Sequence, residues 1–200
     1  MRFNFYLATK NVNKVNEVRR IMSGNNIDVL PCPEGIDFPD ENGVTFEENA
    51  LLKAAHLRSL LPGAFVAGED SGLEVEMLGG QPGVNSARFA GIHGDDRANI
   101  KKLLESLSSF RRMEDRKARF ITSVAFIGSG PPVFFRGEIE GLISLFPRGS
   151  GGFGYDPVFI LPSSGKTFAE MTPEEKNLVS HRASAFRKLS LYLQKGGEKR

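Results

Sequence analysis

The sequence predicts an α/β protein with a long mixed β-sheet, flanking helices and two lobes around a central cleft. Two observations favour this class. Helical and extended patterns alternate near both ends of the chain, and two long β-rich runs, 118–127 and 133–146, follow each other in between. With 200 residues and 40% hydrophobic side chains, the chain is long enough for a sizeable core. We therefore expect residues 1–200 to form a single domain in two lobes.

The first part of the chain predicts a strand, a helix and a second strand. Residues 3–8 form an apolar run typical of a buried strand. Apolar side chains then recur on one side of a helix over 13–23, and Gly24 is a suitable C-terminal stop. A second strand is expected over 27–30. The segment 31–43 holds three prolines and four acidic residues, so it is predicted to be a loop.

A second helix and two short strands follow. Thr45 and the glutamate three residues later have the spacing of a capping box, which predicts a helix ending near Leu61. Short strands are expected over 64–68 and 73–77. The polar residues 69–72 between them are expected to form the connection.

The rest of the chain predicts two more helices around the β-rich hairpin. Asp95 can cap a helix, and the charged segment 111–117 is expected to be a solvated linker. The glycine- and proline-rich residues 128–132 join the two β-rich runs. A strand over 158–161 and a final helix over 173–193 complete the chain.

Charge and composition argue against several classes of protein. The net charge is +2 with acids and bases interspersed, so nothing indicates the basic patch that a nucleic-acid polymer requires. No run approaches the roughly 20 apolar residues of a membrane span, and residues 1–7 lack the long apolar stretch typical of a signal peptide. Cys32 is the only cysteine, which favours a reducing compartment. We expect a soluble cytoplasmic protein.

Two polar segments lie where strands are predicted to end. Segment 9–14, Thr-Lys-Asn-Val-Asn-Lys, precedes the first helix, where backbone N–H groups and a lysine attract phosphate. A plain helix start capped by asparagine is the alternative. Segment 68–72, Gly-Glu-Asp-Ser-Gly, offers two carboxylates for Mg²⁺, and Asp40 or Glu41 could add another. An ordinary polar turn is the alternative there.

A glycine-rich segment provides a third candidate. Residues 149–157 contain Gly-x-Gly-x-x-Gly, but a strand rather than a helix is predicted to follow, which argues against a dinucleotide-binding fold. What remains is a loop whose backbone can approach a ligand closely. Phe153 and Tyr155 in this loop are available to stack on a base.

The last candidate lies in the C-terminal helix. On one unbroken helix, Lys176, His181 and Arg182 would point to three different sides. If all three serve one site, the helix must break near Val179, and Ser180 is a suitable cap for a restarted helix. A solvated helix face is the alternative.

Together these segments resemble the inosine triphosphate pyrophosphatase family, whose members act on deaminated purine nucleotides. The similarity covers nearly the whole chain. The motifs occur together in the same order as in the family, and this joint occurrence is more specific than any single motif. The matching motifs are Ala8-Thr9-x-Asn11-x-x-Lys14, Gly43-x-Thr45-Phe46-x-Glu48-Asn49-Ala50, Glu69-Asp70-Ser71-Gly72-Leu73, Leu78-Gly79-Gly80-x-Pro82-Gly83, Ser86-Ala87-Arg88, Gly151-Gly152-Phe153-Gly154-Tyr155-Asp156-Pro157 and Lys176-x-x-x-Ser180-His181-Arg182.

The resemblance implies a homodimeric, Mg²⁺-dependent enzyme with the nucleotide in its central cleft. Water would attack the α-phosphorus of ITP, dITP or XTP, giving the monophosphate and pyrophosphate and keeping deaminated bases out of DNA and RNA. Asp70 matches the general base. The positions that match substrate contacts are Thr9, Lys10, Asn11, Lys14, Lys53, Ser71, Phe153, Gly154, Tyr155, Asp156, Lys176, His181 and Arg182. The candidate metal ligands are Asp40, Glu41, Glu69 and Asp70.

Two departures from the family pattern concern the metal. Position 69 is Glu where relatives often carry Asp, and Asp40 stands where relatives often carry Glu. Two alternatives to the implied function stay open: a pyrophosphatase of the same fold that acts on other modified nucleotides, and a nucleotide-binding sensor without turnover.

Overall fold

The computed structural model describes residues 2–196, and the chain divides into two compact units. The first unit combines Met1–Asp70, Thr122–Gly137 and His181–Arg200, and the second combines Ser71–Ile121 and Glu138–Ser180. The chain passes from one unit to the other within three of its strands and once more just before the last helix. Residues that are neighbours in sequence, such as those at positions 70 and 71, therefore belong to different units.

The strands form one mixed sheet in the order β2-β1-β3-β4-β5-β6. The first strand is parallel to β2 and β3, whereas β5 and β6 are antiparallel. This confirms the predicted mixed sheet and α/β class. The strands are β1 (Phe3–Ala8), β2 (Ile27–Pro31), β3 (Val66–Val75), β4 (Lys117–Ile127), β5 (Val133–Ile143) and β6 (Phe159–Ile160).

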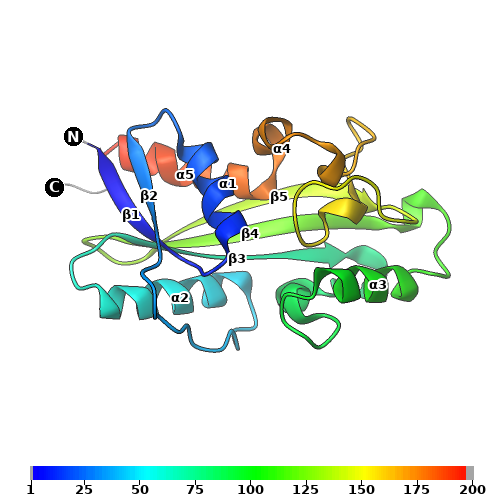
Figure 1. Cartoon of the computed structure of the whole chain (residues 1–200), viewed down its shortest axis with the longest axis horizontal. Coiled ribbons are helices and arrows are strands. Elements are labelled where there is room, and N and C mark those ends of the chain that lie inside the picture. The colour runs from blue at the N-terminus through cyan, green and yellow to red at the C-terminus, as the bar shows by residue number, and fades with distance from the viewer. Residues whose placement is uncertain (1, 197–200) are drawn as a thin grey trace. The chain divides into compact units, whose positions relative to one another are not determined.

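Helices cover both faces of the strands in the first unit. Figure 1 shows α1 (Val12–Met22) and α5 (His181–Gln194) on one side and α2 (Phe46–Leu60) on the other. Side chains of β1 alternate accordingly. Phe5 packs in a cluster with α1 and α5, and Ala8 packs in a second cluster with α2. Side chains of the neighbouring strand β3 alternate in the same way, so each one faces either α1 and α5 or α2.

Two glycines allow helices to lie directly on strands of this unit. A Cβ atom on Gly68 of β3 would lie 2.1 Å from the carbonyl oxygen of Ala50 in α2. A Cβ atom on Gly137 of β5 would lie 2.1 Å from the carbonyl oxygen of His181, the first residue of α5. Both distances are impossible for a real side chain, so glycine is required. These contacts bring the first turns of α2 and α5 against the sheet.

The prediction of two short strands around a polar connection was wrong, because Val66–Val75 form one continuous strand. Glu69 and Asp70 read as turn residues because charged side chains rarely occur inside a buried strand. Both are in fact buried, at 0% and 5% exposure. Partners on each side of the sheet compensate their charge, so the strand continues through them.

The second unit has its own core. Leu73 of β3 packs with Leu103, Phe120 and Phe159 in one buried cluster. The cluster is covered by α3 (Asp96–Ser106), which begins after Asp95 as predicted. The short helix α4 (Pro173–Val179) also belongs to this unit.

Arg116 corrects the expectation of a solvated linker over 111–117. Its side chain is 2% exposed, and burial lowers the pKa of its guanidinium. The guanidinium donates to four backbone carbonyls, those of Leu107, Phe110, Ile143 and Ser144, at 2.6–2.9 Å. One arginine of this charged segment is therefore buried, and its hydrogen bonds connect the end of α3 to the end of β5.

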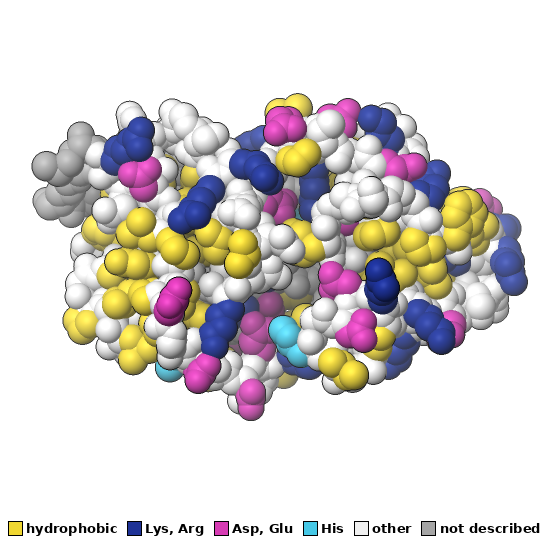
Figure 2. All heavy atoms as spheres, viewed as in Figure 1, with side chains coloured by type: hydrophobic (Ala, Val, Ile, Leu, Met, Phe, Trp, Pro, Cys, Tyr) yellow, Lys and Arg dark blue, Asp and Glu magenta, His cyan; other side chains and the backbone are white. Residues whose placement is uncertain are grey.

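The surface agrees with the near-neutral charge. On the face shown in Figure 2, acidic and basic side chains are interspersed rather than gathered into one basic band. Within residues 2–196, none of the helices is both long and apolar enough to span a membrane.

Candidate active site

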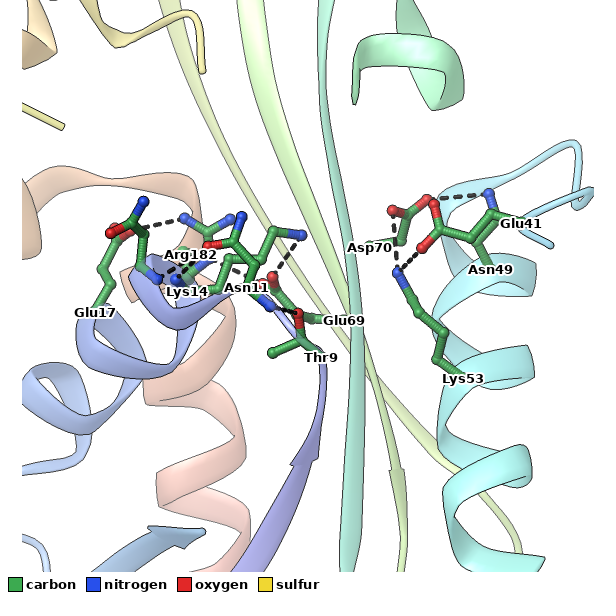
Figure 3. A network of polar contacts seen from close by, with 11 residues as sticks. Thr9, Asn11, Lys14, Glu17, Glu41, Asn49, Lys53, Glu69, Asp70 and Arg182 are labelled. Carbon is green, nitrogen blue, oxygen red and sulfur yellow. Dashed lines mark hydrogen bonds and ion pairs between the residues drawn. The ribbon is translucent and has the colours of Figure 1, made fainter. Parts of the chain in front are cut away.

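Glu69 anchors a buried ion-pair network on one face of β3. Its carboxylate accepts from Arg182 Nε at 2.9 Å and lies 2.8 Å from Lys14 Nζ. The same guanidinium donates through Nη1 to Glu17 at 2.8 Å. Burial alone would raise the pKa of Glu69, but the two cations hold it well below its usual range. This carboxylate is therefore ionised and fully committed to the network (Figure 3).

The start of α1 brings Lys14 into this network. Asn11 is the N-cap of the helix, and its Oδ1 accepts from the backbone N–H groups two and three residues later, at 2.9 and 3.2 Å. Thr9 Oγ1 in turn accepts from the N–H of Asn11 at 3.1 Å. The capping role named as an alternative is thus present. It also fixes the first turn of the helix, from which Lys14 reaches Glu69.

Asp70 points to the opposite face of β3, toward α2. Its Oδ2 accepts from Asn49 Nδ2 at 3.1 Å, and its Oδ1 lies 3.5 Å from Lys53 Nζ. Burial raises the pKa of Asp70, Lys53 opposes this, and Glu41 adds to it. Figure 3 shows this group on the other side of the strand from the Glu69 network. Asp70 is therefore a buried carboxylate that its surroundings neutralise only in part.

Lys53 lies between two carboxylates. Its ammonium contacts Glu41 as well as Asp70, and it is 5% exposed. Burial alone would lower the pKa of Lys53, but the two acids raise it. The carboxylates of Asp70 and Glu41 thus converge on the Lys53 ammonium. Carboxylate oxygens are hard donors of the kind that Mg²⁺ prefers. The pair of Asp70 and Glu41 therefore fits the metal that the sequence predicts.

The predicted metal ligands do not all lie together. Glu69 and Asp70 are consecutive in a strand, so their side chains point to opposite faces. Glu69, bound to Lys14 and Arg182, is thus separated from the other acids, which corrects its assignment as a ligand beside Asp70. Among residues 2–196, no group of three or more acidic, His or Cys side chains could hold a metal ion. Beyond Asp70 and Glu41, the remaining ligands of a bound Mg²⁺ would be substrate phosphates and water.

Two further predicted site residues are exposed at the surface. Lys10 pairs with Asp37 through a 2.6 Å contact between Nζ and Oδ1. Asp40 is exposed, and its backbone carbonyl accepts from the N–H of Asn42 at 3.0 Å. The contacts of Asp70 are instead with Asn49 and Lys53.

In the second unit, the glycine-rich loop is built around Asp156. Its carboxylate accepts from Lys176 Nζ at 2.6 Å and from the backbone N–H of Phe153 at 2.9 Å. The Lys176 ammonium also lies 4.9 Å from the centre of the Phe153 ring. Phe153 is half-buried, so its ring is the aromatic surface of this loop that can still meet a ligand.

Tyr155 does not serve as predicted. It is 5% exposed and belongs to the core cluster of the second unit. Its hydroxyl donates to the carbonyl of Ser86 at 2.9 Å, and burial raises its pKa well above the usual range. Tyr155 therefore holds the loop in place rather than stacking on a base. The neighbouring N–H of Gly154 donates to Asp96 at 2.7 Å, and Ser71 lies half-buried in β3.

The single final helix expected over 173–193 is in fact two helices, and they divide where a break was expected if Lys176, His181 and Arg182 serve one site. The helix α4 ends at Val179, Ser180 has extended backbone angles (φ −66°, ψ 154°), and α5 begins at His181. His181 and Arg182 are 3% and 2% exposed. Arg182 lies between two carboxylates of the first unit, those of Glu17 and Glu69, so its guanidinium contacts protein acids.

Sequence reasoning missed Glu17 and Asn49. Glu17 is 5% exposed and lies three residues after Lys14 on α1. Asn49 is 0% exposed and shares the buried stripe of α2 with Phe46 and Lys53. The signal was present in α2, because a polar residue at the spacing of an apolar stripe indicates a buried partner.

The comparisons with known proteins agree on one family. The model of the Ham1 family matches residues 5–192. A dITP/XTP pyrophosphatase of Clostridium perfringens is 45% identical over 193 residues, which cover 92% of this chain and 94% of the relative. A dITP/XTP pyrophosphatase of Bacillus subtilis is 44% identical over 192 residues, covering 94% and 96%.

Solved structures give the same result at the level of the fold. A HAM1 protein from Coxiella burnetii superposes with a TM-score of 0.86 at 37% identity, covering 96% of this chain and 99% of that one. The Ham1 protein of Staphylococcus aureus superposes with a TM-score of 0.83 at 38% identity, covering 98% and 100%. By sequence and by fold, the chain belongs to the Ham1 family.

Proposed function

We propose that this protein hydrolyses deaminated purine nucleoside triphosphates (ITP, dITP and XTP) to the monophosphate and pyrophosphate. The main observation behind the proposal is that Glu69 and Asp70 place two different polar groups on opposite faces of β3. One face holds Lys14 at a helix start, where phosphate is favoured. The other holds a partly neutralised buried carboxylate beside Lys53 and Glu41. The names of the relatives, dITP/XTP pyrophosphatases, support the substrate class.

The triphosphate is bound by the first unit in this proposal. Lys14 supplies a positive charge, and Thr9, Lys10 and Asn11 belong to the same loop before α1. Lys53 supplies a second positive charge from α2. Lys14 has only a 17% exposed side chain and is held by Glu69, so little freedom is lost when phosphate binds.

Asp70 acts on the attacking water. As a carboxylate it accepts or orients a proton of water while the oxygen attacks the α-phosphorus, and pyrophosphate leaves. Its raised pKa makes it a stronger base than an ordinary aspartate. Bound Mg²⁺, held by Asp70 and Glu41, would neutralise charge on the phosphate oxygens.

Further residues are assigned to recognition of the rest of the substrate. We assign Phe153 to stacking, because it is the half-buried ring of its loop. Deaminated bases carry oxo acceptors where adenine carries an amino donor, so donor groups on the protein favour them. Tyr155 and Arg182 act indirectly, through the hydrogen bonds that they make to Ser86 and to Glu69 and Glu17. The remaining members of the proposed binding set are Ser71, Gly154, Tyr155, Asp156, Lys176, His181 and Arg182.

The role of such an enzyme is to clear the nucleotide pool, which keeps deaminated bases out of DNA and RNA. We assign it to the cytoplasm as a homodimer. Light scattering at micromolar concentration would test the dimer, because a monomeric mass would remove that part of the proposal.

Pyrophosphate release from ITP, measured with Mg²⁺ and with EDTA, tests the function. We expect release from ITP, dITP and XTP that stops with EDTA and is far slower with ATP, GTP, dUTP or dTTP. Preference for dUTP or dTTP would point to another pyrophosphatase of this fold. Binding of ITP without any pyrophosphate release would point to a sensor and refute the proposed hydrolysis.

A further inference from the structure

Asn49 is a fully buried polar residue that makes two bonds in opposite directions. Its Nδ2 donates to Asp70 Oδ2 at 3.1 Å, and its Oδ1 accepts from the backbone N–H of Gly43 at 2.8 Å. It is 0% exposed. One amide group therefore joins a carboxylate in β3 to the loop that precedes α2.

Chemistry fixes the orientation of this amide. Only its oxygen can accept from the N–H of Gly43, and only its NH₂ group can donate to the carboxylate of Asp70. A flipped amide would lose both bonds and leave buried groups unpaired, which is costly. Asn49 therefore requires an acceptor at the Asp70 position and a donor at Gly43 at the same time.

The Gly43 side of this link leads to Glu41. The end of the loop is bound to the first turn of α2, because Glu48 Oε2 accepts from the N–H groups of Val44 at 2.7 Å and Thr45 at 3.3 Å. Gly43 is packed so tightly that an added Cβ atom would lie 2.6 Å from Asn49 Oδ1. Glu41, two residues earlier, then reaches Lys53. Asn49 is thus bonded directly to one acid and to the loop that carries the other.

We propose that Asn49 is a positioning residue that holds the Asp70 carboxylate and the Glu41 loop in one fixed arrangement for hydrolysis. The inference rests on the proposed function, and it adds a residue that touches no reacting atom. A carboxylate with one fixed oxygen has a defined plane, whereas the χ2 torsion of a free aspartate is broad. Small displacements of a reacting group have large effects on rate, so loss of this link should lower turnover.

The test is a double-mutant cycle between Asn49→Ala and Asp70→Asn, read as kcat and KM for ITP. Alone, Asn49→Ala should lower kcat by about 10- to 100-fold, the usual effect of removing a supporting hydrogen bond. KM should change less than kcat, because Lys14, one of the two lysines assigned to the triphosphate, lies on the other face of the strand. In the Asp70→Asn background, Asn49→Ala should change kcat by no more than about twofold, because the group it positions is gone.

Two controls separate positioning from stability. Asn99→Ala removes a comparable buried asparagine, whose Oδ1 accepts from the N–H of Ala90 at 2.7 Å and whose Nδ2 donates to the carbonyl of Ala87 at 3.2 Å. It should lower the Tm like Asn49→Ala without the loss in kcat. If Asn49→Ala does not fold, Asn49→Asp keeps the acceptor for Gly43 but loses the donor to Asp70, and kcat should again fall.

Three results would overturn the inference. Equal losses from Asn49→Ala in both backgrounds would show that it acts independently of Asp70. A wild-type kcat in a folded Asn49→Ala or Asn49→Asp protein would show that no positioning is needed, and an equal kcat loss in Asn99→Ala would attribute the effect to stability. Absence of turnover in the wild type would instead refute the proposed function, and this inference with it.

Discussion

Glu69 and Asp70 are neighbours in one strand, yet their surroundings differ. Glu69 faces two cations, and the pKa of its carboxyl is held well below the usual range. Asp70 faces one cation and a competing acid, and burial raises its pKa. The alternation of side chains along β3 separates the two environments. A fully compensated carboxylate supports other groups, whereas a partly compensated one is available for chemistry.

The two faces of β3 also differ in how far apart in the sequence their contributing residues lie. The Glu69 face combines α1 and α5, whose residues Lys14 and Arg182 lie far apart in sequence. The Asp70 face is built almost entirely from α2 and the loop before it. The first face therefore depends on the assembled unit, and the second depends on one helix and its capping loop.

The largest expected effect is on turnover. Replacing Asp70 with Asn should lower kcat for ITP by about 10²–10⁴-fold, because the group that acts on water is lost. The exposed Asp28→Asn, which removes a surface pair with Arg2, is the matched control and should keep normal kcat. Near-normal pyrophosphate release by a folded Asp70→Asn protein would remove Asp70 from the mechanism.

The next effect is on binding. Lys14→Ala should raise KM for ITP by about 10- to 150-fold, the range expected for a lost hydrogen bond to a charged group. Inosine, which has no phosphates, should bind both proteins equally weakly. The control is Lys101→Ala, because Lys101 is an exposed helical lysine that pairs with Glu105 on its own helix. An unchanged KM in Lys14→Ala would separate the Glu69 face from phosphate binding.

A smaller effect concerns pH. The pKa of Glu69 is lowered in the folded protein, so its pairing stabilises the fold at every pH above its unfolded value of about 4.3. The stability gap between wild type and Glu69→Gln should stay constant from neutral pH down to that value and shrink below it. Urea unfolding at a series of pH values would check this. A gap that shrinks already near neutral pH would mean that Glu69 is not held ionised.

Local signals predicted part of this site. The capping box at Thr45 and the helix start at Asn11 depend on residues a few positions apart, and both are present. The break at Ser180, expected only if one site uses residues from both sides of it, is present as well. They place Lys14 and Arg182 on helices that start beside the sheet. Helix starts are therefore readable because the groups that fix them are near in sequence.

Long-range compensation was not predictable in the same way. Glu69 and Asp70 resembled a turn because their partners Lys53 and Arg182 come from distant elements. Arg116 resembled part of a solvated linker, but backbone carbonyls bind its guanidinium. In each case a buried charged residue was interpreted as a surface residue, because the local sequence does not show which distant group will form its ion pair or hydrogen bonds.

Unfolding of Glu69→Gln and Asp70→Asn, compared in the same metal-free buffer at neutral pH, tests the difference between the two faces most directly. Glu69→Gln should lose about 3 kcal/mol or more, because it breaks a buried ion pair and leaves Arg182 with less compensation. Asp70→Asn should gain stability, because the raised pKa means that the folded protein disfavours the charged form. Opposite signs would support two distinct environments on one strand. Similar losses for both variants would contradict the account.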